Sequence, residues 1–229
     1  MLTGGTGGLG REVARRLAAR GFSLALSYLF PDEANETEEY LGLGEDRLML
    51  RRCDCTDGAA AAAFVEEAAE RFGGINVLCC LVGGWTGGRD VEHTDDMRFD
   101  RMIDVNLRTA FYASRAALPH LRKATWGRIV MIGSRAAIEP PGDQAAYNVA
   151  KAGVIALARS IAQEVGDSAI TSNVVVPSVV DTPTFREAVP FADYVDWPTP
   201  DEIAAVIDFL ASTDSAVVNG AMIPVYGKT

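Results

Sequence analysis

Short apolar runs alternate with longer amphipathic segments along the whole chain. This alternation predicts βαβ units built around a mostly parallel sheet. No shift in composition interrupts it, so we expect one doubly wound α/β domain over residues 1–229, with about seven strands. Apart from the first strand, the expected strands cover residues 22–28, 47–52, 77–82, 128–132, 172–176 and 222–226.

Apolar residues at helical spacing predict the helices between these strands, over residues 11–20, 57–72, 145–165 and 200–211, with a short helix starting at Pro31. A long helix over residues 95–120 should be capped by Thr94, and Pro119 should kink or end it. The sequence Thr199-Pro200-Asp201-Glu202 is typical of a capping box, with proline at the first helical position.

The segment before that capping box has no regular period. Residues 177–200 contain five prolines and four aromatic residues. A stretch of this length without a clear element is more typical of a functional lid than of a simple connection. We therefore expect a substrate lid over about residues 178–199, carrying Phe185, Phe191, Tyr194 and Trp197.

Composition narrows the classes of partner. The 229 residues carry a formal net charge of −10, so the average field of the surface repels nucleic acid. No apolar run is long enough to span a bilayer, and the N-terminus has no signal-peptide pattern. The cysteines form two close pairs without the spacing of a zinc site, which favours structural thiols, no metal and a reducing cytoplasm: Cys53, Cys55, Cys79 and Cys80.

Five of the first ten residues are glycine, and a predicted helix follows at once. Backbone amides at a helix start bind phosphate, and glycines let a pyrophosphate approach the main chain. A flexible linker is the alternative, but the helix that follows favours a dinucleotide site of the Rossmann type. Asp54, after the third strand-like run, suits either an adenine contact or a turn. Neither an acidic nor a basic residue stands at Tyr28-Leu29, and the missing basic clamp favours NAD over NADP.

Tyr147 and Lys151 lie four residues apart on a predicted helix and therefore on one face of it. A nearby ammonium lowers the pKa of a tyrosine, which suits the tyrosine for proton exchange with a substrate. Ser134 follows the strand over residues 128–132, at the sheet edge where ligands bind. Asn106 is a poor helix former in apolar surroundings, so its side chain needs a polar partner.

Together these residues give the chain a resemblance to the short-chain dehydrogenase/reductase family over essentially its whole length. The resemblance implies an NAD(P)-dependent oxidoreductase acting on a small carbonyl or alcohol. In it Tyr147 exchanges the proton, Ser134 positions the substrate oxygen, Lys151 lowers the tyrosine pKa and holds the ribose, and Asn106 anchors a relay water. It also implies a homodimer or homotetramer formed through the long helices, and the following cofactor contacts: Thr3, Gly4, Gly8, Leu9, Gly10, Asp54, Gly83, Tyr147, Lys151 and Thr182.

The segment Gly83-Gly84-Trp85-Thr86-Gly87-Gly88 departs from the usual family sequence and is similar to the quinonoid dihydropteridine reductase branch. This likeness makes Trp85 a candidate substrate contact, although a core or lid tryptophan is an equal alternative. Ser134, typically missing in that branch, favours a general ketone reductase instead. A non-catalytic dinucleotide sensor or assembly subunit is the alternative outside enzymes.

The glycine-rich loop starts at Thr3, so only two residues precede it. Folds of this type place that loop after a full central strand of about five to six residues. We therefore expect a shortened first strand, or a truncated start of the chain.

Overall fold

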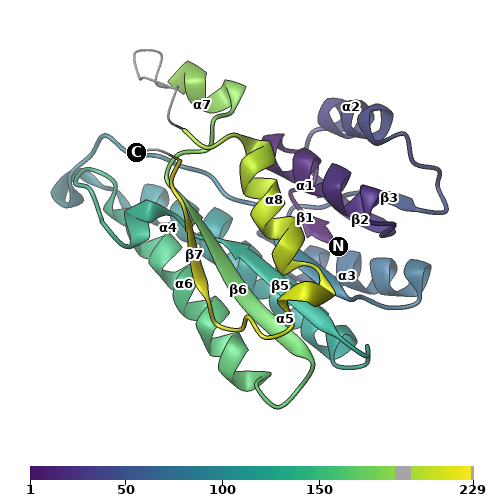
Figure 1. The fold of residues 1–229 in the computed structure, drawn as a ribbon. Coiled ribbons are helices and arrows are strands. Elements are labelled where there is room, and N and C mark those ends of the chain that lie inside the picture. Colours follow the sequence, from purple (N-terminus) through teal and green to yellow (C-terminus); the bar gives the residue numbers. More distant parts are fainter. Residues whose placement is uncertain (189–196, 228–229) are drawn as a thin grey trace.

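The computed structural model describes residues 1–188 and 197–227. Its centre is one sheet of seven parallel strands in the order β3-β2-β1-β4-β5-β6-β7 (Figure 1). This is the expected doubly wound arrangement, with the sequence order reversing beside β1. The strands are β1 (Leu2–Thr3), β2 (Leu24–Tyr28), β3 (Leu48–Arg52), β4 (Val77–Cys80), β5 (Gly127–Ile132), β6 (Ile170–Pro177) and β7 (Met222–Val225).

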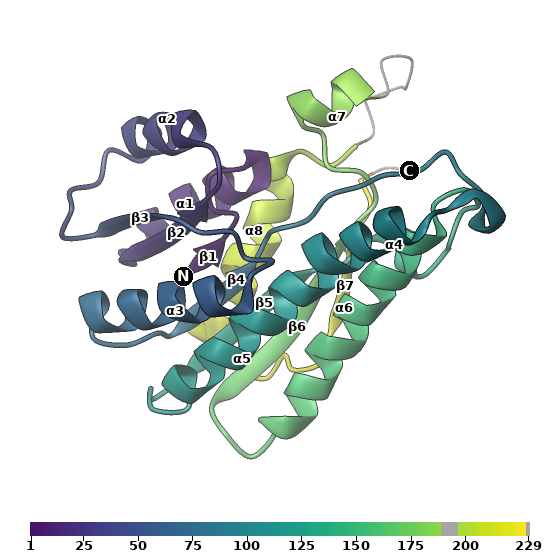
Figure 2. The ribbon, with the colours of Figure 1, turned by 180° about the vertical axis from the view of Figure 1, so that it is seen from behind.

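Helices cover both faces of the sheet. The α-helices are α1 (Gly8–Ala19), α2 (Pro31–Leu41), α3 (Gly58–Phe72), α4 (Asp96–Ile103), α5 (Thr109–Leu121), α6 (Ala145–Glu164), α7 (Pro183–Ala188) and α8 (Pro200–Leu210). A π-helical segment, η2 (Asp104–Arg108), joins α4 to α5, and the 3₁₀ turns are η1 (Val91–His93), η3 (Arg135–Ala137) and η4 (Thr213–Ser215). Helices α1 and α8 pack on one face, and α3, α5 and α6 cover the other (Figure 2).

Each face of the sheet has its own apolar core, because successive side chains of a strand point to opposite sides. On β5, Ile129 and Met131 pack with Phe64 of α3, whereas Val130 and Ile132 belong to the core beneath α1 and α8. All four cysteines are buried free thiols, as expected of structural residues. Among the described residues, no cluster of metal-ligating side chains and no helix able to cross a membrane is found.

The first strand is short, as the sequence predicts. Leu2 pairs with Leu26 on one side and with Cys79 on the other, and Thr3 pairs with Cys80. This short strand is therefore paired on both of its sides. The glycine-rich loop begins directly at the carboxyl end of this strand.

The predicted long helix over residues 95–120 is wrong in two details. Its N-cap is Asp95, whose carboxylate accepts from the Arg98 N–H at 2.8 Å, whereas the Thr94 hydroxyl donates to the Asp90 carbonyl. The η2 segment also interrupts it. Pro119 does not end the helix, since α5 continues past it to Leu121.

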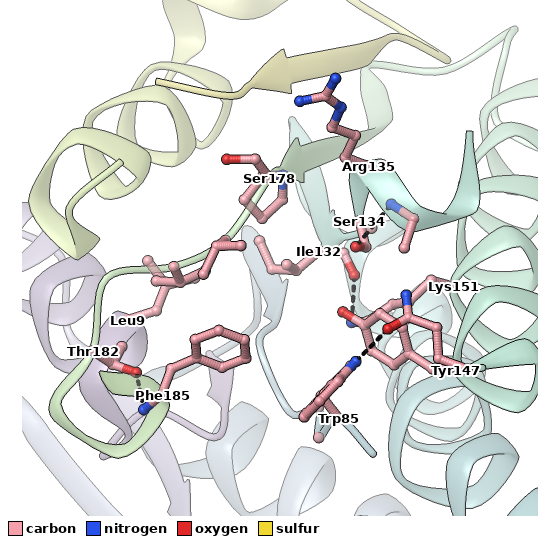
Figure 3. Close-up of a pocket in the computed structure, with 18 of the residues that line it drawn as sticks. Leu9, Trp85, Ile132, Ser134, Arg135, Tyr147, Lys151, Ser178, Thr182 and Phe185 are labelled. Carbon is pink, nitrogen blue, oxygen red and sulfur yellow. Dashed lines mark hydrogen bonds between the residues drawn. The ribbon is translucent and has the colours of Figure 1, made fainter. Parts of the chain in front are cut away.

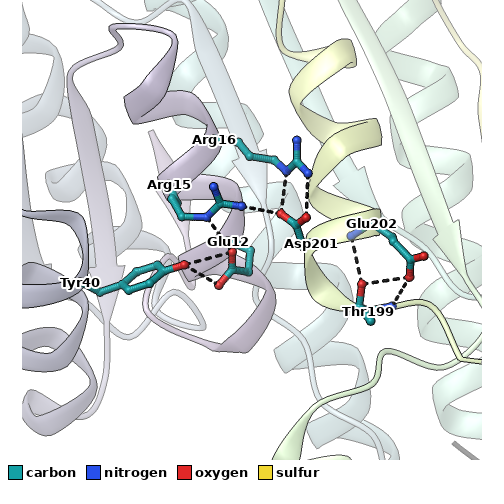
Figure 4. A network of polar contacts seen from close by, with 7 residues as sticks. All are labelled: Glu12, Arg15, Arg16, Tyr40, Thr199, Asp201 and Glu202. Atoms are coloured by element: carbon teal, nitrogen blue, oxygen red, sulfur yellow. Dashed lines mark hydrogen bonds and ion pairs between the residues drawn. The ribbon is translucent and has the colours of Figure 1, made fainter. Parts of the chain in front are cut away.

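A polar network ties α8 to the helix that follows the glycine-rich loop (Figure 4). Asp201 accepts hydrogen bonds from Arg15 and Arg16 of α1, at 2.5 and 2.8 Å. The predicted capping box is present: Glu202 N–H donates to the Thr199 hydroxyl, and Thr199 N–H donates to the Glu202 carboxylate. The start of α8 is therefore fixed against α1.

Candidate active site

The connections that leave the carboxyl ends of β1, β4, β5 and β6 surround a cavity of about 620 Å³ (Figure 3). This size and position are typical of ligand sites in open α/β sheets. The lining residues are Leu9, Leu81, Gly83, Gly84, Trp85, Ile132, Gly133, Ser134, Arg135, Ala136, Glu139, Pro141, Gln144, Tyr147, Lys151, Pro177, Ser178, Val179, Val180, Thr182, Phe185 and Trp197.

Three of the four residues expected to be catalytic meet in this cavity. Ser134 follows β5 and caps the η3 turn, where its hydroxyl accepts from the Ala136 N–H at 3.2 Å. Tyr147 and Lys151 project from the first turns of α6, with the Lys151 Nζ 5.9 Å from the centroid of the tyrosine ring. The cavity therefore brings a hydroxyl, a phenol and an ammonium together.

The ammonium of Lys151 is held by a hydrogen bond to the last residue of β5. Its Nζ donates to the Ile132 carbonyl at 2.9 Å, and the side chain is buried. Loss of solvation disfavours the charged form and lowers the pKa of Lys151 to about 8. The lysine therefore titrates near neutrality rather than far above it.

The tyrosine behaves differently from the sequence expectation. Burial raises the pKa of Tyr147 above its ordinary value, and a hydrogen bond with Ser134 partly opposes this rise. The expected lowering by Lys151 is not among the causes of this shift, and burial decides its direction. Tyr147 consequently keeps its proton at neutral pH, the form that a proton donor needs.

Asn106 lies in η2 and does not line the cavity. Its Nδ2 donates to the Gly84 carbonyl at 2.9 Å, and its Oδ1 accepts from the Gly84 N–H at 3.2 Å. A Cβ on Gly83 would lie 3.0 Å from this Oδ1 and 3.2 Å from the Lys151 Nζ. Asn106 therefore holds the glycine-rich segment after β4 close to Lys151.

The loop between β1 and α1 is closely folded on itself. Gly4 has a φ of +68°, and its N–H donates to the Ser27 hydroxyl at 2.9 Å. A Cβ on Gly10 would lie 2.1 Å from the Gly4 carbonyl oxygen, so only glycine fits there. No side chain caps the first turn of α1, and that turn has no acidic residue. An uncapped helix start of this kind is suited to a phosphate.

The other expected cofactor contacts have different surroundings. The Thr3 hydroxyl is buried and has no hydrogen-bond partner within the described part of the chain. A Cβ on Gly8 would lie 3.2 Å from Thr182, which brings the 178–188 segment against the loop. Asp54 has the turn role: its Oδ1 accepts from the N–H and the hydroxyl of Thr56, at 2.9 and 2.7 Å.

Aromatic residues line the side of the cavity nearest α7. Trp85, Phe185 and Trp197 all contribute, so Trp85 is a cavity residue with 43% of its surface exposed rather than a core residue. Phe191 and Tyr194 of the expected lid lie outside the described residues. Gln144 was not among the expected site residues, although its Oε1 accepts a hydrogen bond from the Trp85 Nε1. Its position three residues before Tyr147 is the feature of the sequence that could have indicated it.

Comparisons with known proteins agree with this geometry. Residues 4–227 match a family model described as Enoyl-(Acyl carrier protein) reductase. A relative from Mycobacterium bovis, named 3-oxoacyl-acyl-carrier-protein reductase MabA, is 34% identical over 99% of this chain and 90% of its own length. A relative from Sphingomonas, named 2-dehydro-3-deoxy-L-rhamnonate dehydrogenase (NAD(+)), is 30% identical over 93% of this chain and 88% of its own length.

Solved structures are similar over nearly the entire chain. A crystal structure from Brucella melitensis, described as a short-chain dehydrogenase/reductase of the glucose/ribitol dehydrogenase type, superposes with a TM-score of 0.91. It is 29% identical and covers 99% of this chain and 94% of that chain. The similarity therefore extends over nearly the whole fold.

Proposed function

Because the chain belongs to the short-chain dehydrogenase/reductase family, we propose that it transfers a hydride between a nicotinamide cofactor and a small carbonyl or alcohol substrate. The observation that carries this proposal is the meeting of Ser134, Tyr147 and Lys151 in one cavity with Leu9 of the glycine-rich loop. The test follows nicotinamide absorbance with a panel of ketones. A protein that binds neither NADH nor NADPH would refute the proposal.

The residues at the cavity fit a dinucleotide. The uncapped start of α1 suits the pyrophosphate. The Thr3 hydroxyl has no partner among the described residues, and Thr182, which lines the cavity, lies against Gly8 of the same loop. Leu9, Gly83 and Lys151 would complete the nicotinamide half. Asp54 holds the Thr56 turn through its Oδ1 and would meet the adenine end with its other carboxylate oxygen. When bound, the cofactor supplies or accepts the hydride.

This chain's own residues perform the proton chemistry. Tyr147 donates its proton to the carbonyl oxygen, and Ser134 holds that oxygen with its hydroxyl. We assign to the charged Lys151, whose Nζ lies 5.9 Å from the centroid of the Tyr147 ring, the stabilisation of the phenolate during the transfer. We also assign to Asn106 the relay water that the family resemblance implies, alongside its hold on Gly84.

The titration of Lys151 should appear in the pH profile. Since the pKa of Lys151 is lowered to about 8, the ammonium is charged below that pH and neutral above it. We expect kcat for ketone reduction to be level below pH 8 and to fall above it. In Lys151→Arg, any remaining activity should stay level to higher pH because a guanidinium keeps its charge. Lys123→Arg, outside the cavity, is the control and should retain the wild-type profile.

We assign the coenzyme preference to Glu33, an acidic residue that follows the strand end at Tyr28-Leu29. Glu33, in the first turn of α2, accepts a hydrogen bond from the Thr6 hydroxyl of the glycine-rich loop at 3.2 Å. A carboxylate held beside the loop repels a 2′-phosphate, which supports NAD over NADP.

Glu33→Gln should therefore raise the ratio of kcat/KM with NADPH to that with NADH. Removing one like-charge contact in water is worth about 1 kcal/mol, or about fivefold. Steady-state kinetics with both coenzymes measure this ratio. Glu36→Gln, an exposed neighbour on α2, is the matched control. An unchanged ratio in Glu33→Gln would remove Glu33 from this role.

The remaining expectations are proposals of the same kind. We assign the lid to residues 178–199, where α7 brings Phe185 into the cavity.

The position of Trp85 is compatible with a dihydropteridine-type substrate, but Ser134 at the same cavity favours a ketone reductase. A non-catalytic sensor is not favoured, because the catalytic side chains are assembled. A reducing cytoplasm suits the four free cysteines.

We propose a homodimer or homotetramer formed through the long helices. Phe111 of α5 and Val149 of α6 are 44% and 52% exposed, which leaves apolar surface for a second copy. Light scattering is the test, and a monomer would contradict the proposal.

A further inference from the structure

Three aromatic side chains form one side of the cavity, and we call Trp85, Phe185 and Trp197 the aromatic wall. The ring centroids of Trp85 and Phe185 lie 5.8 Å apart at 62°, and those of Phe185 and Trp197 lie 5.6 Å apart at 69°. These edge-to-face contacts link the three rings to one another. In Figure 3, Phe185 enters the cavity from the side of Thr182, opposite Tyr147. Phe185 of the wall therefore lies across the cavity from Tyr147.

A relay of amide side chains sets the orientation of the indole of Trp85. Its Nε1 donates to the Gln144 Oε1 at 2.8 Å, and the Gln144 Nε2 donates to the Asn148 Oδ1 at 3.0 Å. The Asn148 Nδ2 then donates to the Pro141 carbonyl at 2.9 Å. Gln144 and Asn148 flank Tyr147 at the start of α6. The helix that carries the proton donor thus also positions the wall.

The glycine-rich segment after β4 is shaped around the same indole. A Cβ on Gly87 would lie 2.7 Å from the Trp85 ring, so a larger residue would push the indole away. The next residue but one, Arg89, donates its N–H to the carbonyl of Asp143 at 3.0 Å. Asp143 has a φ of +55°, a conformation that aspartate tolerates better than most residues. Two contacts therefore join this segment to the start of α6, one through the backbone and one through Trp85.

The cavity offers little to a charged substrate. Its lining residues include two cations, and both are engaged. The Arg135 Nε pairs with the Glu139 carboxylate at 2.8 Å, and the Lys151 Nζ donates to the Ile132 carbonyl. A substrate carboxylate or phosphate would have to displace one of these partners. An uncharged substrate avoids that cost.

From these observations we propose that the aromatic wall selects an uncharged, planar ring carbonyl, which stacks on one ring of the wall and meets the next ring edge to face while its oxygen faces Ser134 and Tyr147. Gln144 acts as a positioning residue through the indole. This inference rests on the proposed function, because it names the substrate class of the same site. Flat rings gain more from aromatic faces than flexible chains of equal size, since chains also lose rotational freedom on binding.

Three ketones of ten carbons test the proposal: β-tetralone, whose bicycle contains a flat aromatic ring, trans-β-decalone, its saturated counterpart, and methyl octyl ketone, which is an open chain. We expect kcat/KM for β-tetralone to exceed that for β-decalone by about 3- to 10-fold, the range of an aromatic contact, with methyl octyl ketone lower still. Trp85→Leu should bring the ratio of β-tetralone to β-decalone close to one. Equal values in the wild type, or a ratio unchanged in Trp85→Leu, would overturn the proposal.

The role of Gln144 requires a double-mutant cycle. Gln144→Ala should raise KM for β-tetralone about 3- to 5-fold, the loss of one hydrogen bond, with a smaller change in kcat. In the Trp85→Phe background, which lacks the indole N–H, Gln144→Ala should add nothing further. Gln163→Ala, an exposed glutamine near the other end of α6, is the matched control. Additive effects would show that Gln144 does not act through Trp85.

Two further outcomes separate this inference from the proposed function. A tetralone bearing a carboxylate should have a kcat/KM lower by at least about tenfold, and equal turnover would overturn the preference for an uncharged substrate. If no ketone is turned over with either coenzyme, the proposed function fails. Calorimetric titration with the three neutral ketones then still decides the selectivity: tighter binding of β-tetralone supports the wall, and equal binding overturns it.

Discussion

Tyr147→Phe is expected to lower kcat for ketone reduction by about 10³-fold, within the range that a positioned acid contributes. The variant removes one hydroxyl from a ring that lies in the cavity with Ser134, so the carbonyl oxygen loses its proton donor. The ring itself remains, and the dissociation constant for NADH should change by less than about twofold. Steady-state kinetics and fluorescence titration measure the two quantities.

Tyr112→Phe supplies the matched control for this hydroxyl deletion. Tyr112 lies on α5 beside Phe111 and Arg115 and does not line the cavity, so its loss should leave kcat unchanged. Turnover in Tyr147→Phe close to the wild-type value would assign the proton to another group. Loss of turnover together with loss of NADH binding would point to structural damage instead.

Gly10→Ala is expected to weaken dinucleotide binding by at least about 100-fold and to lower Tm. The new Cβ would lie 2.1 Å from the Gly4 carbonyl oxygen and 2.8 Å from the Gly5 backbone, and neither atom belongs to a flexible side chain. Overpacking of this kind costs about 1–3 kcal/mol, which lowers Tm by about 2–10 °C in a chain of this length. Titration with NADH and calorimetric unfolding give the two readings.

A second glycine of the same loop tests whether crowding is the cause. At Gly7 a Cβ would meet only the Gly4 carbonyl oxygen, at an ordinary contact distance of 3.7 Å. Gly7→Ala should therefore keep Tm near its wild-type value. Wild-type behaviour in Gly10→Ala would contradict the close packing of the loop.

Local signals in the sequence predict most of the fold. The Thr199 capping box depends on residues within one helical turn, and the alternating strand pattern follows from burial on both faces of the sheet. Where two local signals compete, the prediction is less exact. Thr94 and Asp95 are both good N-caps. In the structure Asp95 accepts the Arg98 N–H, whereas the Thr94 hydroxyl donates to the Asp90 carbonyl.

Contacts between distant segments set the limit of the sequence analysis. Trp85 and Gln144 are 59 residues apart, so neither residue alone indicates the hydrogen bond between them. The direction of the Tyr147 pKa shift depends on burial and on the hydrogen bond with Ser134, and a spacing of four residues between Tyr147 and Lys151 reports neither. The π-helical turn that contains Asn106 has no local signature, because each of its residues is also compatible with an α-helix.

The arrangement of the cavity has a consequence for how its substrate range changes under selection. Helix α6 carries Tyr147 and Lys151 and anchors Trp85 through Gln144, so altered residues along its first turns disturb chemistry and selectivity at once. Phe185 comes from a separate segment, after β6. We therefore expect variants with a new substrate range to accumulate changes in residues 178–188, where sequence drift leaves the proton-transfer geometry of α6 intact.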